Sequence, residues 1–188
     1  NVTINNGTAT YHLQEKIIPL TGGYTLDYYT TLQGTLVGEQ GKKYELRIET
    51  GGQVYTAITT IPFLTKKLDS LWWKKAPNNP DTNKVVVMSR ITDPPGLGNY
   101  IRYFTSSNNK DFYPGLNSVF DDQIVDGKTY DIQVDRGVSK NEKIKFDDYG
   151  YFKRGDTVIV KFCNIDKASY DFWRTWEFTY QSVGNPFS

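Results

Sequence analysis

One short segment constrains the fold more than any other part of the sequence. In Tyr44-Glu45-Leu46-Arg47-Ile48-Glu49, apolar and charged side chains alternate with a period of two. Successive side chains of a β-strand point to opposite faces of its sheet, so this alternation is typical of a strand with one buried face. The segment therefore predicts a strand that lies between a core and water.

The composition extends this prediction to the whole chain. Four Trp, fourteen Tyr and ten Phe among 188 residues favour pleated sheet over helix. A chain of this length can bury a substantial core without disulfides. Its 22 basic and 21 acidic side chains give a net charge of +1. A charge this small does not attract the protein to nucleic acid or to an anionic membrane. No stretch of about 18 apolar residues is present, so no membrane-spanning helix is expected.

Turn signals rich in Gly, Asn and Pro separate the other expected strands. The first eleven residues indicate two strands around the turn Asn6-Gly7, which is a strong hairpin signal. Gly51-Gly52 joins the alternating segment to the next strand of a second hairpin. The remaining expected strands are residues 24–32, 54–61, 68–75, 85–88, 100–105, 130–134 and 158–162.

One helix is expected, near residues 167–181. Asp166 can cap its first turn by accepting hydrogen bonds from free backbone N–H groups. Aromatic side chains then follow at spacings of 3, 3 and 4 residues: Tyr170, Trp173, Trp176 and Tyr180. That spacing predicts an aromatic stripe against a sheet.

The expected fold class is mainly β, in two parts. Residues 1–64 are expected to form an immunoglobulin-like or transthyretin-like β-sandwich portion. Residues 65–188 are expected to form a second β-rich unit that carries the helix. Because the chain opens within a strand pattern and ends abruptly at Gly184-Asn185-Pro186-Phe187-Ser188, we expect a fragment of a longer protein.

The glycine-rich stretch Asp93-Pro94-Pro95-Gly96-Leu97-Gly98 could be a phosphate cradle or a turn. A cradle needs backbone N–H groups that converge at a helix N-terminus, usually with a lysine after the glycines. A strand pattern follows instead, at residues 99–103. The turn interpretation is therefore favoured.

Residues for catalysis and metal binding are scarce. The chain has one histidine, His12, and one cysteine, Cys163, which leaves no Cys/His cluster for zinc. A Cys-His dyad is conceivable, but Cys163 follows an apolar run that favours a buried structural thiol. We expect no cofactor, no metal and no enzymatic activity.

Two acidic pairs, Asp121-Asp122 and Asp147-Asp148, could act as general acid and base or bind calcium. Adjacent residues of a strand point to opposite faces, so neither pair converges unless it lies in a loop. Solvated turn acids are the favoured interpretation.

An aromatic platform that stacks on sugars is the remaining possibility. Most of these aromatic side chains are more simply explained as core. The candidate ligand-binding residues are Trp72, Trp73, Tyr100, Arg102 and Tyr103.

A series of short motifs runs along the chain in a fixed order. They are residues 41–48, Tyr55-Thr56-Ala57 with Thr60-Ile61-Pro62, Asp93-Pro94-Pro95-Gly96 with 98–103, Phe120-Asp121-Asp122, residues 168–175 and Gly184-Asn185-Pro186-Phe187. The series resembles the Bacteroidetes lipoprotein family called domain of unknown function 4249, although Ile101 replaces the second tyrosine of that family's paired tyrosines.

The resemblance implies a mostly β lipoprotein, anchored to the outer membrane by a lipid outside this fragment, at the cell surface or the periplasmic face. It implies an accessory or substrate-capture role beside a TonB-dependent transporter or another outer-membrane complex. The family offers no catalytic residues to carry over. The alternative hypothesis is a free-standing glycan-binding protein with an aromatic platform, and an enzyme that uses His12 or an acidic pair ranks third.

Two triplets match the pattern of Bacteroidetes O-glycosylation sites. They are Asp69-Ser70-Leu71 and Asp156-Thr157-Val158. They predict modification of Ser70 and Thr157.

Overall fold

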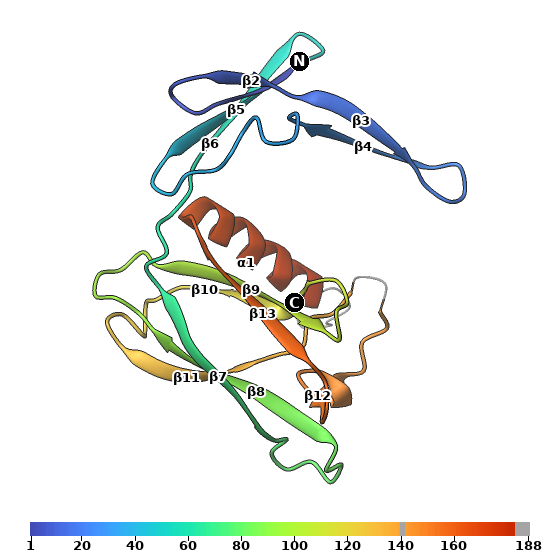
Figure 1. The fold of residues 1–188 in the computed structure, drawn as a ribbon, viewed down its shortest axis with the longest axis vertical. Coiled ribbons are helices and arrows are strands. Elements are labelled where there is room, and N and C mark those ends of the chain that lie inside the picture. Colours follow the sequence, from blue (N-terminus) through green and yellow to red (C-terminus); the bar gives the residue numbers. More distant parts are fainter. Residues whose placement is uncertain (140–141, 183–188) are drawn as a thin grey trace. The chain divides into compact units, whose positions relative to one another are not determined.

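The computed structural model describes residues 1–139 and 142–182. The chain forms two compact units, Asn1–Phe63 and Leu64–Ser188 (Figure 1). Within the described residues, all paired strands are antiparallel and a single α-helix follows the last strand. The predicted mainly β class with one C-terminal helix is thereby confirmed. The motif at residues 184–187 lies outside the described residues.

The first unit consists of a four-stranded sheet and a separate hairpin. The sheet has the order β2-β1-β5-β6, and the hairpin pairs β3 with β4. The strands are β1 (Val2–Asn5), β2 (Thr10–His12), β3 (Gln14–Pro19), β4 (Thr25–Thr30), β5 (Lys43–Thr50) and β6 (Gln53–Thr60). The alternation that opened the sequence lies in β5, where Tyr44 is buried and Glu45 and Arg47 are exposed. The immunoglobulin-like or transthyretin-like assignment of this unit stays a prediction.

The second unit contains two sheets. In one, β8 pairs with β7, β11 and β12; in the other, the order is β10-β9-β13. The strands are β7 (Lys67–Lys75), β8 (Lys84–Thr92), β9 (Tyr100–Ser107), β10 (Tyr113–Phe120), β11 (Thr129–Val134), β12 (Phe152–Lys153) and β13 (Val158–Ile165). A short 3₁₀ helix, η1 (Phe146–Asp148), precedes β12.

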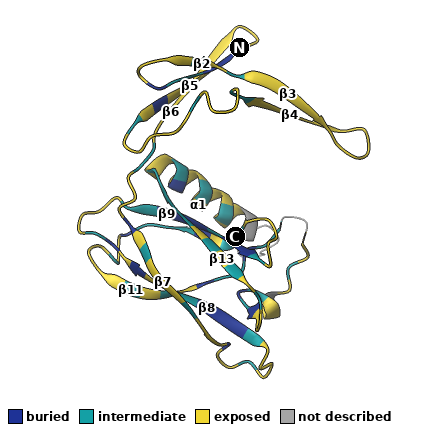
Figure 2. Cartoon of the chain, in the orientation of Figure 1, coloured by how far each residue is buried: buried dark blue, intermediate teal, exposed yellow. Residues whose placement is uncertain are grey.

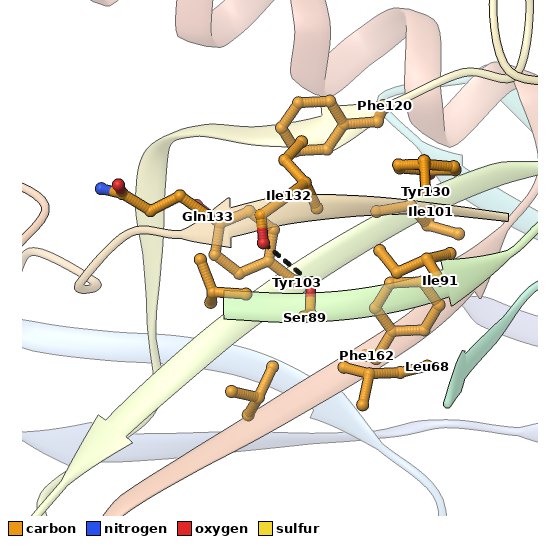
Figure 3. A pocket seen from close by; sticks show the side chains of 12 residues that line it. Leu68, Ser89, Ile91, Ile101, Tyr103, Phe120, Tyr130, Ile132, Gln133 and Phe162 are labelled. Carbon is orange, nitrogen blue, oxygen red and sulfur yellow. Dashed lines mark hydrogen bonds between the residues drawn. The ribbon is translucent and has the colours of Figure 1, made fainter. Parts of the chain in front are cut away.

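The core of the second unit lies between these sheets. Val85, Val87, Val134 and Phe152 of the first sheet form one buried cluster with Tyr103 of the second, and β8 carries a long buried stretch (Figure 2). A cavity of about 20 Å³ lies between the sheets and is lined mainly by apolar side chains, which Figure 3 shows. A space of this size has room for about one water molecule, so the interior is a packed core and not a ligand chamber.

Strands β3, β10 and β12 were not among the expected strands. In β10, Pro114 and Gly115 are residues that disfavour a strand interior. Proline is tolerated on an edge strand, where its missing N–H faces no partner, and the β10–β9 register shifts between Pro114 and Val119. Gly115 is required there, since an added Cβ would lie 2.6 Å from the Tyr103 hydroxyl. The proline and the glycine thus mark an irregular edge strand.

The helix α1 (Lys167–Ser182) contacts β10 and β9. Its first turn is capped as predicted, since the carboxylate of Asp166 accepts a hydrogen bond of 2.8 Å from Ser169 N–H. Tyr170 is buried and stacks on Tyr100 with 4.9 Å between ring centroids. The predicted stripe is wrong at Trp176, which is 58% exposed. The side chain of Tyr180 lies outside the described residues.

Candidate functional site

The glycine-rich loop between β8 and β9 does form a cradle of backbone N–H groups, but carboxylates of the chain itself occupy it. Asp122 accepts hydrogen bonds from Gly98 N–H (2.9 Å) and Asn99 N–H (2.8 Å), and Asp126 accepts one from Gly96 N–H (2.6 Å). The loop therefore joins the segment after β10 and has no free donors at these positions for a phosphate. Gly96 and Gly98 have φ angles of 110° and 117°, a region that glycine alone enters readily.

Asp93, at the start of this loop, takes part in a fully enclosed ion pair. Its Oδ1 lies 3.1 Å from Nζ of Lys66, and both side chains are 0% exposed. The other carboxylate oxygen accepts a hydrogen bond of 3.3 Å from Gly127 N–H. The Tyr130 ring centroid lies 5.5 Å from the ammonium. A buried pair of this kind is a specific feature that sequence patterns do not reveal.

Three carboxylates meet at this place. One oxygen from each of Asp93, Asp122 and Asp126 lies within 4.8 Å of the others. Oxygen ligands suit a hard divalent cation, yet each of these carboxylates already has a partner: the Lys66 ammonium forms an ion pair with Asp93, and loop N–H groups donate to the other two. The cluster of carboxylates is a poor fit for a metal ion, because the Lys66 ammonium already supplies a positive charge beside it.

The backbone of Lys66 is held by a side chain of the opposite sheet. The Asn164 carboxamide, on β13, accepts a hydrogen bond from Lys66 N–H and donates one to the Lys66 carbonyl, each 3.0 Å long. The neighbouring Thr65 hydroxyl donates to the Asn99 side chain at 2.7 Å. We call the two hydrogen bonds between the Asn164 carboxamide and the Lys66 backbone the Asn164 clamp.

The hydrogen bonds to Asp122 have an electrostatic consequence. Burial alone would raise the pKa of Asp122, but the bonds from Asn99 and Gly98 outweigh it, and this pKa lies below the usual value. A carboxyl whose pKa is lowered by folding stabilises the protein above its unfolded pKa, and that stability is lost as the pH falls through the folded value.

We therefore expect acid sensitivity that depends on Asp122. The Asp122→Asn variant should be less stable than wild type at pH 6, and the difference in urea midpoint should shrink as the pH falls below about 4, where model carboxyls protonate. Urea titrations followed by tryptophan fluorescence at several pH values measure this. A difference that stays constant with pH would contradict the role of the ionised carboxylate.

The predicted ligand residues Tyr100, Arg102 and Tyr103 all lie on β9, but they have different surroundings. Tyr103 is 5% exposed in the core and Tyr100 lies against Tyr170. Arg102 is 8% exposed and lies beneath the helix, with its guanidinium 3.5 Å from the Trp173 ring centroid. These three side chains do not form one exposed platform.

A polar network continues from Arg102 to the helix. Its Nε donates to Ser118 Oγ at 3.2 Å, and the Glu177 carboxylate accepts hydrogen bonds from both the hydroxyl and the N–H of Ser118. Burial lowers the pKa of Arg102, and the negative charge of Glu177 opposes that effect. This network holds α1 on the sheet.

Trp72 and Trp73 lie next to each other on β7 and therefore point to opposite faces of it. Trp72 is partly buried, with the Arg90 guanidinium 5.8 Å from its ring centroid, whereas Trp73 is 56% exposed. The structure thus offers one exposed indole here and not a pair of coplanar rings. Binding of a ligand by these residues stays a prediction.

The remaining sequence candidates lie apart. His12 is exposed on β2 of the first unit, and Cys163 is partly buried on β13 of the second. Ser70 and Thr157 are both exposed, so modification of either stays a prediction.

The acidic pairs do not converge. Asp121 accepts a hydrogen bond of 2.8 Å from the Tyr170 hydroxyl, whereas Asp122 faces the glycine loop. Asp148 forms an ion pair with Lys84. The solvated-turn interpretation is wrong for Asp122, which is 2% exposed.

A second buried polar cluster lies beside Gly115. Burial raises the pKa of Asp135 and raises that of Tyr149 to about 12, although the bond that the Tyr149 hydroxyl accepts from Leu116 N–H (2.7 Å) opposes the rise. The pKa of Tyr103 is raised by the same burial. These phenols stay protonated at neutral pH and act as hydrogen-bonding parts of the core.

The second unit also contains a polar basin of about 980 Å³, a volume in the upper range of ligand pockets. Sequence patterns gave no sign of it, because its lining comes from segments far apart in the chain. The basin carries three rings, Tyr113, Tyr151 and Phe152, and five acidic side chains. Its basic side chains are Lys84, Lys110, Arg136, Lys143, Lys145, Lys153 and Arg154.

Together these features define a class of protein: a mainly β chain of two units, whose second unit is a two-sheet structure with a helix on one sheet and a polar basin. Among the described residues, none of the helices has the length and apolarity needed to cross a membrane. The chain belongs to the family described as Domain of unknown function (DUF4249), whose model matches residues 1–188. The family predicted from the motifs is confirmed. None of the curated proteins and none of the solved structures compared with the chain matches it.

Proposed function

We propose that the protein is a non-enzymatic, lipid-anchored outer-membrane protein that acts as an accessory or substrate-capture subunit of a TonB-dependent transporter or another outer-membrane complex. Membership of the family assigns no activity by itself. The proposal is supported by the resemblance to Bacteroidetes lipoproteins and by one observation on the first unit, an apolar hairpin that is open to solvent.

The hairpin β3–β4 is exposed along almost its whole length. Its large apolar side chains are 41% to 73% exposed: Ile17, Ile18, Leu20, Tyr24, Leu26, Tyr28 and Tyr29. An isolated two-stranded hairpin is marginally stable in water at best, and contiguous exposed apolar surface marks interaction sites. A hairpin of this composition is therefore suited to docking on a protein partner.

One face of the hairpin is the better docking face. Ile18 pairs with Leu26 across the two strands, and Tyr28 pairs with Lys16 on the same face. The opposite face carries Asp27 next to Ile17. Apolar anchors beside a tyrosine, with charge at the margin, are the usual composition of an interface core.

The polar basin supports the substrate-capture part of the proposal. Its lining mixes cations, acids and two tyrosines, and this lining suits a hydrogen-bonding or anionic ligand better than an apolar one. A basin of this kind favours a capture role over a purely structural one.

The test is purification of the tagged, intact gene product from outer membranes in mild detergent, with the accompanying proteins identified by mass spectrometry. We expect a TonB-dependent barrel or another outer-membrane protein in stoichiometric amount. The double variant Ile18→Ser/Leu26→Ser should lose at least about 90% of that partner, because interface anchors contribute most of the binding energy.

The matched control is Ile124→Ser, which removes an equally apolar side chain that is 83% exposed in the second unit. It should retain the partner. A photo-reactive amino acid at position 28 of the otherwise unchanged protein should cross-link to the same partner. This experiment remains informative even if the hairpin of the double variant misfolds. Purification of the wild-type protein alone would contradict the proposal.

A glycan-binding protein is the second candidate, and the exposed indole of Trp73 favours it. The guanidinium of Arg154, which lines the basin, lies 5.5 Å from the Trp73 ring centroid. A sugar in the basin could therefore reach the indole. A glycan array with the wild-type fragment and with Trp73→Ala separates the two candidates, since a capture subunit for non-glycan cargo shows no hits in either form.

A further inference from the structure

The ion pair of Lys66 and Asp93 is incompletely satisfied. Among the buried side-chain atoms of the described residues, Lys66 Nζ and Asp93 Oδ1 are those without a hydrogen-bond partner. An ammonium carries three donors, and a buried pair offsets its desolvation only when further hydrogen bonds satisfy the remaining protons and lone pairs. Within the described part of the chain, the only hydrogen bond to either charged group is the 3.3 Å bond from Gly127 N–H to Asp93 Oδ2. The ionised pair is therefore an unfavourable end state.

Both groups are nevertheless held against each other. In the β7–β8 ladder, Lys67 pairs with Thr92, so Lys66 and Asp93 occupy the next position along the two strands. The Asn164 clamp fixes the Lys66 backbone, and Asp93 N–H donates to the Lys128 carbonyl at 3.0 Å. Neither backbone can withdraw without breaking hydrogen bonds.

The pair is also shielded from bulk solvent. Lys66 and Asp93 have 0% side-chain exposure, and Nζ lies 3.1 Å from Oδ1. A nucleophile and a carbonyl held in contact, away from solvent, react with a much higher effective concentration than free groups.

We propose that Lys66 and Asp93 condense to form an intramolecular isopeptide bond. A proton first passes from the Lys66 ammonium to the Asp93 carboxylate across their 3.1 Å contact. The neutral Nζ then attacks Cγ of Asp93, the new Nζ–Cγ bond forms, and one Cγ–O bond breaks. A second proton from the nitrogen joins the departing hydroxyl, so that one water molecule is released. The reaction converts an ammonium and a carboxylate into a neutral amide and needs no oxidant, reductant or cofactor.

The bond would tie the residue before β7 to the residue after β8. It would close a covalent loop around this pair of strands, and a cross-link of this kind restricts the unfolded chain as a disulfide does. The chain has a single cysteine, Cys163, so it cannot form a disulfide within itself. The inference is independent of the docking role proposed above.

The test is the intact mass of the purified wild-type protein, measured by electrospray under denaturing conditions. We expect a mass lower than that of the sequence by one water molecule, in most of the protein. Lys66→Arg, which keeps the charge but removes the nucleophilic amine, should show the full sequence mass. Lys67→Arg, at the exposed neighbouring position, should still show the loss of water.

A protease digest of the wild type should contain one branched peptide that joins the segments around residues 66 and 93. This measurement needs no variant and therefore stands even if Lys66→Arg fails to fold. A wild-type protein that is folded and has the full sequence mass would overturn the inference. A loss of water that persists in Lys66→Arg, or a branch at another lysine, would overturn it as well.

Discussion

Replacement of Asp122 by alanine is expected to lower the free energy of unfolding by about 2–4 kcal/mol, since a hydrogen bond to a charged group contributes roughly 1.5–3 kcal/mol and the bonds to one carboxylate do not add fully. The carboxylate accepts N–H bonds from Gly98 and Asn99 as well as one from the Asn99 side chain. Without it, the loop between β8 and β9 loses its attachment to the segment after β10. Urea denaturation at pH 7 measures the change.

Asp126→Ala is the matched control for this prediction. Asp126 also accepts a loop N–H, from Gly96, but its side chain is exposed and makes one such bond. Water replaces an exposed acceptor readily, so we expect a loss of less than about 1 kcal/mol. Equal losses in the two variants would mean that the cradle of N–H groups does not determine the stability of the loop.

Arg102→Ala is expected to cost about 2–4 kcal/mol, because it removes a largely buried side chain that packs under the helix and donates to Ser118. The guanidinium lies between two rings, 3.5 Å from the centroid of Trp173 and 4.8 Å from that of Phe104. Its loss removes two cation–π contacts and the nearby positive charge that offsets Glu177. Arg102→Lys should recover part of the loss, since lysine keeps the charge but lacks the planar fork.

The measurement is a thermal and urea melt with Trp fluorescence as the signal, because the indole of Trp173 reports on the helix contact directly. Arg174→Ala serves as the control, since Arg174 is exposed and its guanidinium lies 5.8 Å from the Tyr170 ring centroid. Its effect should stay within about 0.5 kcal/mol. If Arg102→Ala behaves like Arg174→Ala, the helix is held by apolar contacts alone.

The sequence predicts the regular strands well because their signals are local. The alternation in β5, the Asn6-Gly7 hairpin and the Asp166 cap each depend on neighbouring residues, and the structure confirms all three. The sequence does not predict β10, because its proline and glycine are suited to a strand only at an edge beside Tyr103. That fit depends on a residue more than ten positions away.

The candidate site is less predictable for the same reason. Lys66 and Asp93 are separated by a whole hairpin, and nothing in either segment indicates that the two charges are buried together. Local patterns also cannot tell which residues of an aromatic-rich helix face a sheet. Trp173 packs on Arg102, whereas Trp176, at the predicted spacing, is exposed.

The Asn164 clamp determines how the second unit responds to mechanical force. Its hydrogen bonds join the backbone just before β7 to β13, a strand of the other sheet. A pull transmitted along the chain through residue 65 would therefore load both sheets at once, instead of unzipping the edge strand β7 one hydrogen bond at a time. Such a geometry resists a pull along the chain better than an edge strand that opens from one end.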